Sequence, residues 1–225
     1  MNGRAKGVEA VIFDMGGILH PTPFEVLPAI AAAQGWPLDA FPRGPFDPAS
    51  DPDYGEMDRG RIREPQYWAK VSDRLARLGI AFDIHDVVDW EGKDRVEVVD
   101  AIRRLAPRYR LALLTNDATD WLGPGWRHTW WLRDAFEVMV DAAEEGVRKP
   151  TPEIYQRVST ALEVAPEACV FVDDLTVNCE GAADVGMQPF WFDVTNPRGS
   201  VRRLLEWLLP DEVGAALAAT ESEGT

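Results

Sequence analysis

The chain has 225 residues and a mass of 25.1 kDa; 46% of its residues are apolar and 27% are charged. These values are typical of an ordinary globular domain, or of a core with one sizeable insertion, and exclude a disordered chain. The 23 Lys and Arg residues stand against 38 Asp and Glu, which gives a net charge of −15 and a pI near 4.6. Because this charge repels nucleic acids and anionic membrane surfaces, we expect neither as a partner.

The sequence also predicts the compartment. Its two cysteines, Cys169 and Cys179, are too few for a disulfide framework and favour a reducing environment. Residues 1–6 are not followed by an apolar signal core, and the longest uncharged stretch, residues 26–38, is too short to cross a bilayer. We therefore expect a cytoplasmic protein.

Short β-rich runs alternate with helical patterns along most of the chain. Helices are predicted at residues 96–105, after Thr151-Pro152, and at 201–208, where apolar residues recur at helical spacing or a capping Thr precedes a proline. Such alternation predicts an α/β fold with a Rossmann-like parallel sheet flanked by helices. The predicted strands are residues 8–13, 111–115, 138–140, 169–172 and 189–192.

Residues 20–93 interrupt this alternation. Helical stretches are predicted near residues 24–34 and 65–78, separated by a proline-rich loop at 36–53 without a strand pattern. We interpret residues 20–93 as a helical cap inserted after the first strand, with residues 1–19 and 94–225 forming the core. Because ligands bind at the carboxyl ends of parallel strands, this cap is expected to overhang a site.

The residues that could carry chemistry follow the predicted strands. Asp14 ends the first strand, Thr115-Asn116 the second and Asp173-Asp174 the fourth, while Lys149 follows the third. A parallel sheet would bring all of them to one edge, where three carboxylates require either a divalent cation or the protonation of some of them. Carboxylate oxygens and a backbone carbonyl suit Mg²⁺, and with Lys149 the formal charges balance to zero. The predicted cofactor is therefore Mg²⁺, and an anionic substrate could enter.

Four segments in this order resemble the haloacid dehalogenase-like (HAD) superfamily of hydrolases. They are VIFDMGGIL (11–19), LLTN (113–116), VRKPTPEIY (147–155) and VFVDDLTVNCEGAADVGM (170–187). Each lies at a predicted strand end or directly after one, and the resemblance extends over the whole core. GEMDRGRI (55–62) is similar to a cap segment of the family. The resemblance implies a phosphoric monoester hydrolase acting on a small phosphorylated metabolite.

The resemblance also implies catalytic and phosphate-binding roles. Asp14 would be the nucleophile that forms an aspartyl-phosphate. Thr115 and the N–H of Asn116 would hold phosphate oxygens, with the N–H groups of Met15 and Gly16 opposite. Lys149 would neutralise charge on the nucleophile and on the transferring phosphoryl group.

The metal ligands implied by the resemblance are Asp14, the carbonyl of Gly16, and Asp174, with Asp173 acting indirectly or through water. Asn178 could hydrogen-bond within this site or only tie the following helix to its loop. Both interpretations remain open from the sequence.

One position departs from the family pattern. Many phosphatases of the superfamily carry a second Asp, as general acid and base, where this chain has Gly16. The DxGG pattern resembles a subgroup that includes sugar-1-phosphate phosphatases, which implies a sugar phosphate as substrate. His20 could replace the missing acid, although a hinge or surface role is the more common one for such a histidine.

Two further functions stay open from the sequence. A non-catalytic or weakly active phosphate-binding regulatory protein would fit the glycine at position 16. A 2-haloacid dehalogenase would use the same nucleophile on carbon, but the retained Asp173-Asp174 pair disfavours it. The tryptophan-rich segment 121–131 could face a flat ligand or pack onto the core.

Overall fold

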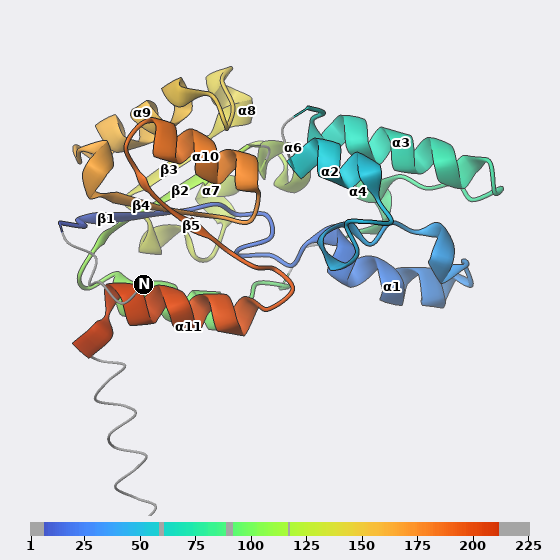
Figure 1. Ribbon diagram of the computed structural model, residues 1–225, viewed down its shortest axis with the longest axis horizontal. Helices are drawn as coiled ribbons and strands as arrows, with labels where there is room; N and C mark the ends of the chain where they lie inside the picture. The colour runs from blue at the N-terminus through green and yellow to red at the C-terminus, as the bar shows by residue number, and fades with distance from the viewer. Residues whose placement is uncertain (1–6, 59–60, 89–91, 117, 212–225) are drawn as a thin grey trace, which may run out of the picture.

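The computed structural model describes residues 7–58, 61–88, 92–116 and 118–211. At its centre is a sheet of five parallel strands in the order β3-β2-β1-β4-β5, as predicted for an α/β fold (Figure 1). The strands are β1 (Ala10–Phe13), β2 (Arg110–Thr115), β3 (Val138–Asp141), β4 (Cys169–Asp173) and β5 (Gln188–Trp191). Each overlaps a run predicted from the sequence.

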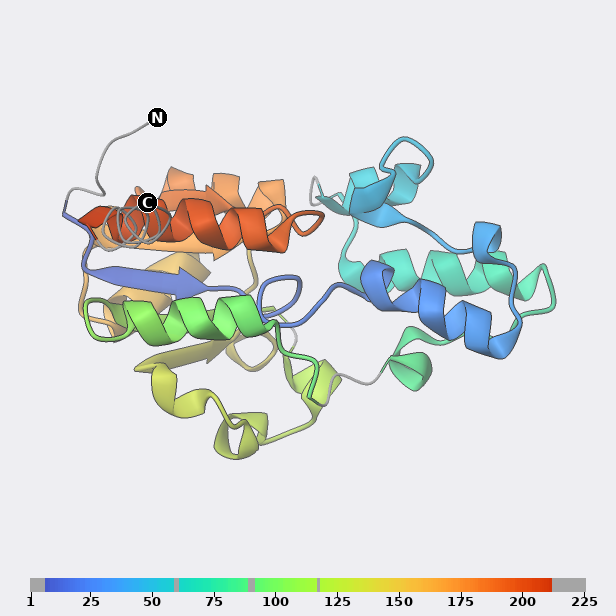
Figure 2. The ribbon, with the colours of Figure 1, turned by 90° about the horizontal axis from the view of Figure 1, so that it is seen from below.

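Helices cover both faces of this sheet. α9 (Pro152–Ala161) and α10 (Thr176–Asp184) lie on one face, and α5 (Val96–Leu105) and α11 (Pro197–Leu208) lie side by side on the other (Figures 1 and 2). Because neighbouring residues of a strand point to opposite faces, every central strand supplies both layers of the core. In β1, for example, alternate side chains join the α9–α10 cluster and the α5–α11 cluster.

The strand order places the functional edge beside β1. The chain runs from β1 to β2 on one side and later returns to β4 on the other, so the order reverses next to β1. Phe13 pairs with Leu113 of β2 and with Val172 of β4, and the three strands therefore end almost level. The carboxyl end at such a reversal is where open α/β sheets bind ligands.

Four helices between β1 and α5 form a separate group beside the sheet (Figures 1 and 2). We call residues 23–88 the helical group. Its helices bury their own apolar cluster, in which Phe24, Tyr67 and Trp68 pack ring against ring. The helices are α1 (Pro23–Gln34), α2 (Pro52–Asp58), α3 (Glu64–Ala76) and α4 (Ile84–Val87).

The predicted loop at 36–53 is only partly a loop. It contains two 3-10 turns, Leu38–Ala40 and Gly44–Phe46, and its end is already the first turn of α2. Proline occupies the first position of α2, where its missing N–H costs nothing, so it starts this helix instead of breaking it. Of the segment 55–62 quoted above, residues 59–60 lie outside the described residues.

The tryptophans of the segment 121–131 lie in three different surroundings. Trp126 and Trp130 are buried against each other in the α5–α11 cluster, whereas Trp131 is half exposed. Trp121 instead lines a cavity beside the sheet edge.

No helix among the described residues is long and apolar enough to span a membrane. The remaining short elements after β2 are the helices α6 (Ala118–Leu122), α7 (Trp126–Thr129) and α8 (Ala142–Glu145) and the 3-10 turns Arg133–Ala135 and Pro166–Ala168.

Candidate active site

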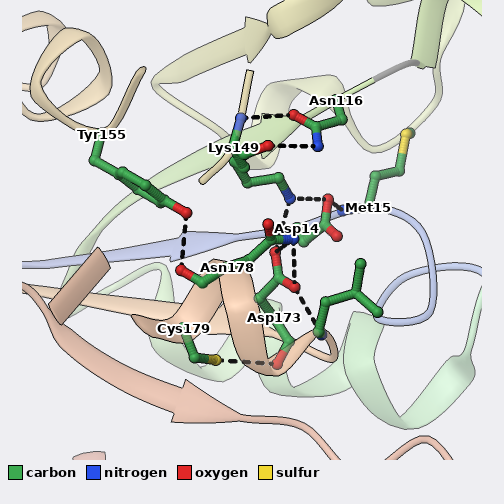
Figure 3. Close-up of polar contacts among 9 residues, drawn as sticks. Asp14, Met15, Asn116, Lys149, Tyr155, Asp173, Asn178 and Cys179 are labelled. Atoms are coloured by element: carbon green, nitrogen blue, oxygen red, sulfur yellow. Dashed lines mark hydrogen bonds and ion pairs between the residues drawn. The ribbon is translucent and has the colours of Figure 1, made fainter. Parts of the chain in front are cut away.

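A buried lysine joins two strand-end carboxylates at the edge of the sheet. The Nζ of Lys149 lies 2.8 Å from Oδ1 of Asp14 and 2.7 Å from Oδ2 of Asp173 (Figure 3). Its side chain is 1% exposed. Burial alone would lower the pKa of Lys149, but the two carboxylates outweigh it and hold that pKa above its ordinary value. Lys149 is therefore a fixed positive charge between the ends of β1 and β4.

Asp14 follows the last residue of β1 and lies in an unusual electrostatic environment. Burial, opposed mainly by the Lys149 charge, raises the pKa of Asp14 to about 7. The N–H of Met15 donates a 2.7 Å hydrogen bond to Oδ1 of Asp14, the same oxygen that faces Lys149. Both contacts thus orient the carboxylate through Oδ1.

Asp173 is enclosed by donors. Its Oδ1 accepts hydrogen bonds from the N–H of Leu175 at 2.9 Å and from Nδ2 of Asn178 at 3.0 Å, while Oδ2 faces Lys149 and Nδ2 of Asn178 (Figure 3). With a side chain that is 0% exposed, it fits an indirect role near a metal better than that of a ligand. Asn178 thus bonds within the site and also ties the start of α10 to the loop, so both sequence interpretations hold.

Asp174 offers the more accessible carboxylate. Ligand oxygens of Asp14, Asp173 and Asp174 lie within 4.8 Å of one another. Burial, together with the charges of Asp173 and Asp14, raises the pKa of Asp174 well above its ordinary value. One buried and two partly buried carboxylates beside one lysine lack positive charge, and oxygen donors at this spacing fit a hard divalent cation such as Mg²⁺.

The turn after β1 leaves room for this carboxylate. A Cβ on Gly17 would lie 2.6 Å from Oδ2 of Asp174, and its φ of +74° is in the left-handed region that favours glycine. At Gly16 a Cβ would meet nothing within 4 Å. Gly17 is therefore required for close approach of the Asp174 carboxylate, a requirement that the sequence interpretation missed.

Asn116 fixes the position of the lysine through its backbone. Its Oδ1 accepts a 2.9 Å hydrogen bond from the N–H of Lys149, and its Nδ2 donates to the Lys149 carbonyl at 3.4 Å (Figure 3). Thr115, the last residue of β2, is buried beside it. The ends of β2 and of the 147–149 segment are thereby joined to each other.

These residues surround a cavity of about 120 Å³ between the sheet edge and the helical group. Asp173 lies outside its wall. The cavity also includes residues not predicted from the sequence, among them Tyr54 and Met57 of α2. Their spacing of three, typical of one helix face, was the available signal. The predicted site residues that line the cavity are Asp14, Met15, Gly16, Thr115, Asn116, Lys149 and Asp174.

His20 is buried at the rim of the cavity. Its Nδ1 lies 3.2 Å from Oδ1 of Asp94. Burial, opposed by Asp94, lowers the pKa of His20. Its pairing with Asp94, just before α5, fits the structural role at the start of the connection to the helical group.

The family model of the haloacid dehalogenase-like hydrolases matches residues 8–186. The chain belongs to this family. The match covers both sheet neighbours of β1 and the complete set of strand-end residues described above. It confirms a hydrolase family with a Rossmann-like core.

Curated relatives are more distant. The chain is 27% identical to mouse acyl-CoA dehydrogenase family member 10 over 88% of its own length but spans only 19% of that protein. It is also 27% identical to phosphatase MT3486 of Mycobacterium tuberculosis (strain CDC 1551 / Oshkosh), covering 83% of this chain and 88% of the relative. A glyceraldehyde 3-phosphate phosphatase of Pyrococcus furiosus is 40% identical over 62 residues, 27% of this chain and 26% of that protein.

Solved structures share the fold. The HAD-hydrolase YfnB of Bacillus subtilis, bound to magnesium, aligns with a TM-score of 0.64 at 17% identity, over 84% of this chain and 88% of that one. The L-2-haloacid dehalogenase of Xanthobacter autotrophicus aligns with a TM-score of 0.56 at 22% identity, over 81% and 76%. These likenesses show the fold alone.

Proposed function

We propose that this hydrolase is a Mg²⁺-dependent phosphatase that cleaves a small phosphorylated metabolite through an aspartyl-phosphate at Asp14. The observation that carries the proposal is the bridge of Lys149 between Asp14 and Asp173, next to the Asp174 carboxylate and in the wall of one cavity. A fixed cation beside an oriented carboxylate is what attack on a phosphate ester requires.

In the proposed reaction, Oδ2 of Asp14 attacks phosphorus because Oδ1 is engaged by Lys149 and the Met15 N–H. The bond from phosphorus to the ester oxygen breaks, and the alkoxide leaves with the electron pair and takes a proton from water, since no side chain stands at Gly16 to supply it. Water then hydrolyses the aspartyl-phosphate to free phosphate and restores Asp14. Lys149 neutralises charge in both steps.

The remaining roles are part of the same proposal. Asp14, Asp174 and the Gly16 carbonyl would hold Mg²⁺, which when bound neutralises charge on phosphoryl oxygens. The N–H groups of Met15, Gly16 and Asn116, with the Thr115 hydroxyl, would hold the phosphate. Residues 20–93 would form the cap, and residues 1–19 with 94–225 the core.

The relatives support this assignment at a coarse level. One that spans nearly the whole chain is named a phosphatase, a second over a short segment is named a glyceraldehyde 3-phosphate phosphatase, and a protein of the same fold binds magnesium. The sugar phosphate implied by the DxGG pattern stays a prediction. It belongs in the test panel as one class of substrate.

The test measures phosphate release from a panel of phosphorylated metabolites with and without Mg²⁺, using wild type, Asp14→Asn and the surface control Asp53→Asn. We expect release that needs Mg²⁺, is lost with Asp14→Asn and is retained with Asp53→Asn, since Asp53 pairs with Lys70 on the exterior of the helical group. Equal release by Asp14→Asn and wild type would refute the proposed nucleophile.

Gly16 favours one alternative, a phosphate-binding protein with little or no turnover, because no side chain stands at this position to protonate the leaving group. Calorimetric binding of inorganic phosphate in the presence of Mg²⁺, without turnover of any ester, would support that alternative. A parallel assay for halide release from 2-chloropropionate tests the dehalogenase reaction, which would need no metal.

A further inference from the structure

The cavity beside Asp14 has two chemically different walls. The sheet edge contributes the polar groups assigned above to phosphate and metal. The opposite wall, from the helical group and α6, is mainly aromatic and aliphatic. Its apolar members are Pro21, Pro23, Phe24, Tyr54, Met57, Trp121 and Leu122. If the phosphate occupies the polar side, the alcohol part of the ester must contact this second wall.

Charge restricts what that wall accepts. Among the described residues that line the cavity, Lys149 is the only Lys or Arg, and Asp14 and Asp173 already neutralise it. Glu64, at the start of α3, adds a negative charge to the wall. A second carboxylate or phosphate on the substrate would lose its hydration without gaining a cation.

Two polar side chains of this wall, Thr22 and Glu64, are already engaged by protein partners. The hydroxyl of Thr22 donates to Oε2 of Glu25 at 3.1 Å, and Oε1 of Glu64 accepts from Nε1 of Trp68 at 3.0 Å. A substrate rich in hydroxyl groups would therefore bury donors and acceptors with few partners, which weakens binding. The wall instead offers ring and methylene surface.

The size of the cavity sets the remaining limit. The cavity of about 120 Å³ must also hold the phosphate, and even a dry cavity of roughly 150 Å³ in another protein accommodates only benzene. Trp121, whose ring centroid lies 4.2 Å from that of His85, also lines the cavity. The alcohol part is therefore limited to a short chain or at most a single ring.

Resting on the proposed phosphatase function, we propose that the substrates are phosphate monoesters whose alcohol part is small, uncharged and mainly apolar, such as a single aromatic ring or a short aliphatic chain. Phe24, Met57 and Trp121 bind this part through contact with its apolar surface. Glu64 and the absence of an unpaired cation in the described wall exclude esters with a second anionic group.

The test compares kcat/KM for three aryl phosphates whose phenols have similar acidity: 4-methylphenyl phosphate, 4-(carbamoylmethyl)phenyl phosphate and 4-(carboxymethyl)phenyl phosphate. The last two match in shape and differ in charge. We expect 4-methylphenyl phosphate to be cleaved best. The carboxymethyl compound should be cleaved at least about tenfold less efficiently than the carbamoylmethyl compound, because the charge of its carboxylate has no partner. Cleavage of the carboxymethyl compound with the same kcat/KM as the carbamoylmethyl compound would overturn the proposal.

Two variants test the wall itself. Met57→Lys places a cation there, with Met57→Gln as a neutral control of similar size, and we expect only the lysine to shift selectivity toward the carboxylate by about tenfold or more. Glu64→Gln keeps an acceptor for Trp68 and removes the charge, so it provides the same selectivity test if Met57→Lys does not fold. Selectivity unchanged in folded Met57→Lys, or in Glu64→Gln where Met57→Lys does not fold, would overturn the proposal.

The outcomes separate this inference from the function on which it rests. Mg²⁺-dependent phosphate release from glucose 6-phosphate or phosphoglycolate, with poor cleavage of 4-methylphenyl phosphate, would overturn the substrate class and leave the phosphatase function standing. No release from any ester, under conditions in which circular dichroism shows a folded protein, would overturn both.

Discussion

Lys149 is the residue on which both stability and the proposed chemistry depend most. Its replacement by methionine keeps most of the volume but leaves the buried Asp173 and Asp14 carboxylates without their common cation. We expect a loss of about 3–5 kcal/mol in the free energy of unfolding at pH 8. Phosphate release should fall about 10²–10³-fold, because the transferring group loses its neutralising charge.

Urea unfolding of Lys149→Met at pH 8 and pH 5 measures this effect. The loss should be smaller at pH 5, where unpaired carboxyls are more readily protonated. Lys70→Met is the matched control, since its ion pair with Asp53 is half exposed, and it should change stability by less than about 1 kcal/mol. Equal losses in the two variants would contradict the central role of Lys149.

The carboxyl groups of the site predict how pH and metal act together. Burial raises the pKa of Asp14 from 3.8 to about 7 in the folded protein. Between these values the metal-free folded state binds more protons than the unfolded state, so this group's contribution to stability decreases as pH rises. Mg²⁺ binds the deprotonated groups, and its stabilising effect should therefore increase with pH.

Thermal unfolding with and without Mg²⁺ at pH 5 and pH 8 checks this. We expect the Mg²⁺-induced rise in Tm to be larger at pH 8 and to be mostly lost in Asp174→Asn, which removes the proposed direct ligand. Asp184→Asn, a change in the last turn of α10 and outside the cavity lining, serves as control and should retain the rise. A rise of equal size in Asp174→Asn would assign the metal to other groups.

At the scale of single elements, the turn after β1 determines how closely the loop after β4, which carries Asp174, can approach that turn. Gly17→Ala brings a Cβ to 2.6 Å from Asp174 Oδ2 and places alanine at a φ of +74°, a conformation that costs about 1–2 kcal/mol. We expect that loss of stability together with at least about tenfold weaker Mg²⁺ binding. Gly16→Ala, where a Cβ meets nothing within 4 Å and φ is not positive, should cost less in stability.

Isothermal titration with Mg²⁺ and thermal unfolding of the two alanine variants compare the positions directly. The contrast is informative because the two glycines are adjacent in the chain but differ in φ and in what surrounds them. If Gly16→Ala weakened Mg²⁺ binding more than Gly17→Ala, the close approach of Asp174 to the turn would not be what positions the metal site.

The elements that could be predicted from the sequence are those in which the spacing of apolar residues indicates which side chains are buried. The strands buried on both faces read as apolar runs, and α5 and α11 carry a regular apolar stripe, so both kinds were found to within a few residues. α2 was missed because its initial proline resembles a loop signal, and α7 because four residues are too few to show a period. Their structure depends on packing that only the folded chain provides.

The site follows the same division. Asp14, Thr115, Lys149 and Asp173 could be placed together because parallel strands align their carboxyl ends, a consequence of topology. The second contact of Lys149, with Asp173, and the close approach of Gly17 to Asp174 could not, since both depend on distances between loops far apart in sequence. For Trp121 the sequence left a flat ligand and the core open as alternatives, and for Met57 it indicated no contact with a ligand, because this wall exists only where two separate helices meet the cavity.

At the scale of the whole molecule, the described residues form three apolar clusters, one on each face of the sheet and one within the helical group. The chain passes twice between the core and the helical group. Arg95 joins the two parts, because it bonds to carbonyls that follow β1 and to a carboxylate of α1. Its N–H donates to the Leu19 carbonyl at 2.7 Å, its Nε to the Gly17 carbonyl at 3.3 Å, and its Nη2 pairs with Glu25 of α1 at 2.6 Å. Separate clusters joined by few contacts predict two units of local unfolding.

Leu75→Ala tests this division. Leu75 is fully buried in the helical group, so its truncation should cost about 2–5 kcal/mol there. Native-state hydrogen exchange should show amides of α1 and α3 exchanging at least about 30-fold faster, the equivalent of about 2 kcal/mol, with little change in β1 and β4. Ile102→Ala, an equally buried change in α5, should produce the reverse pattern.

The two variants together decide whether residues 20–93 behave as a cap. If the substrate must enter beneath the helical group, that group has to open without unfolding the sheet that holds Asp14 and Lys149, which requires its stability to be separable from that of the core. Acceleration of exchange in both regions by both variants would mean one cooperative unit. Entry to the cavity would then have to occur without movement of the helical group, and the proposed division of the chain into cap and core would be wrong.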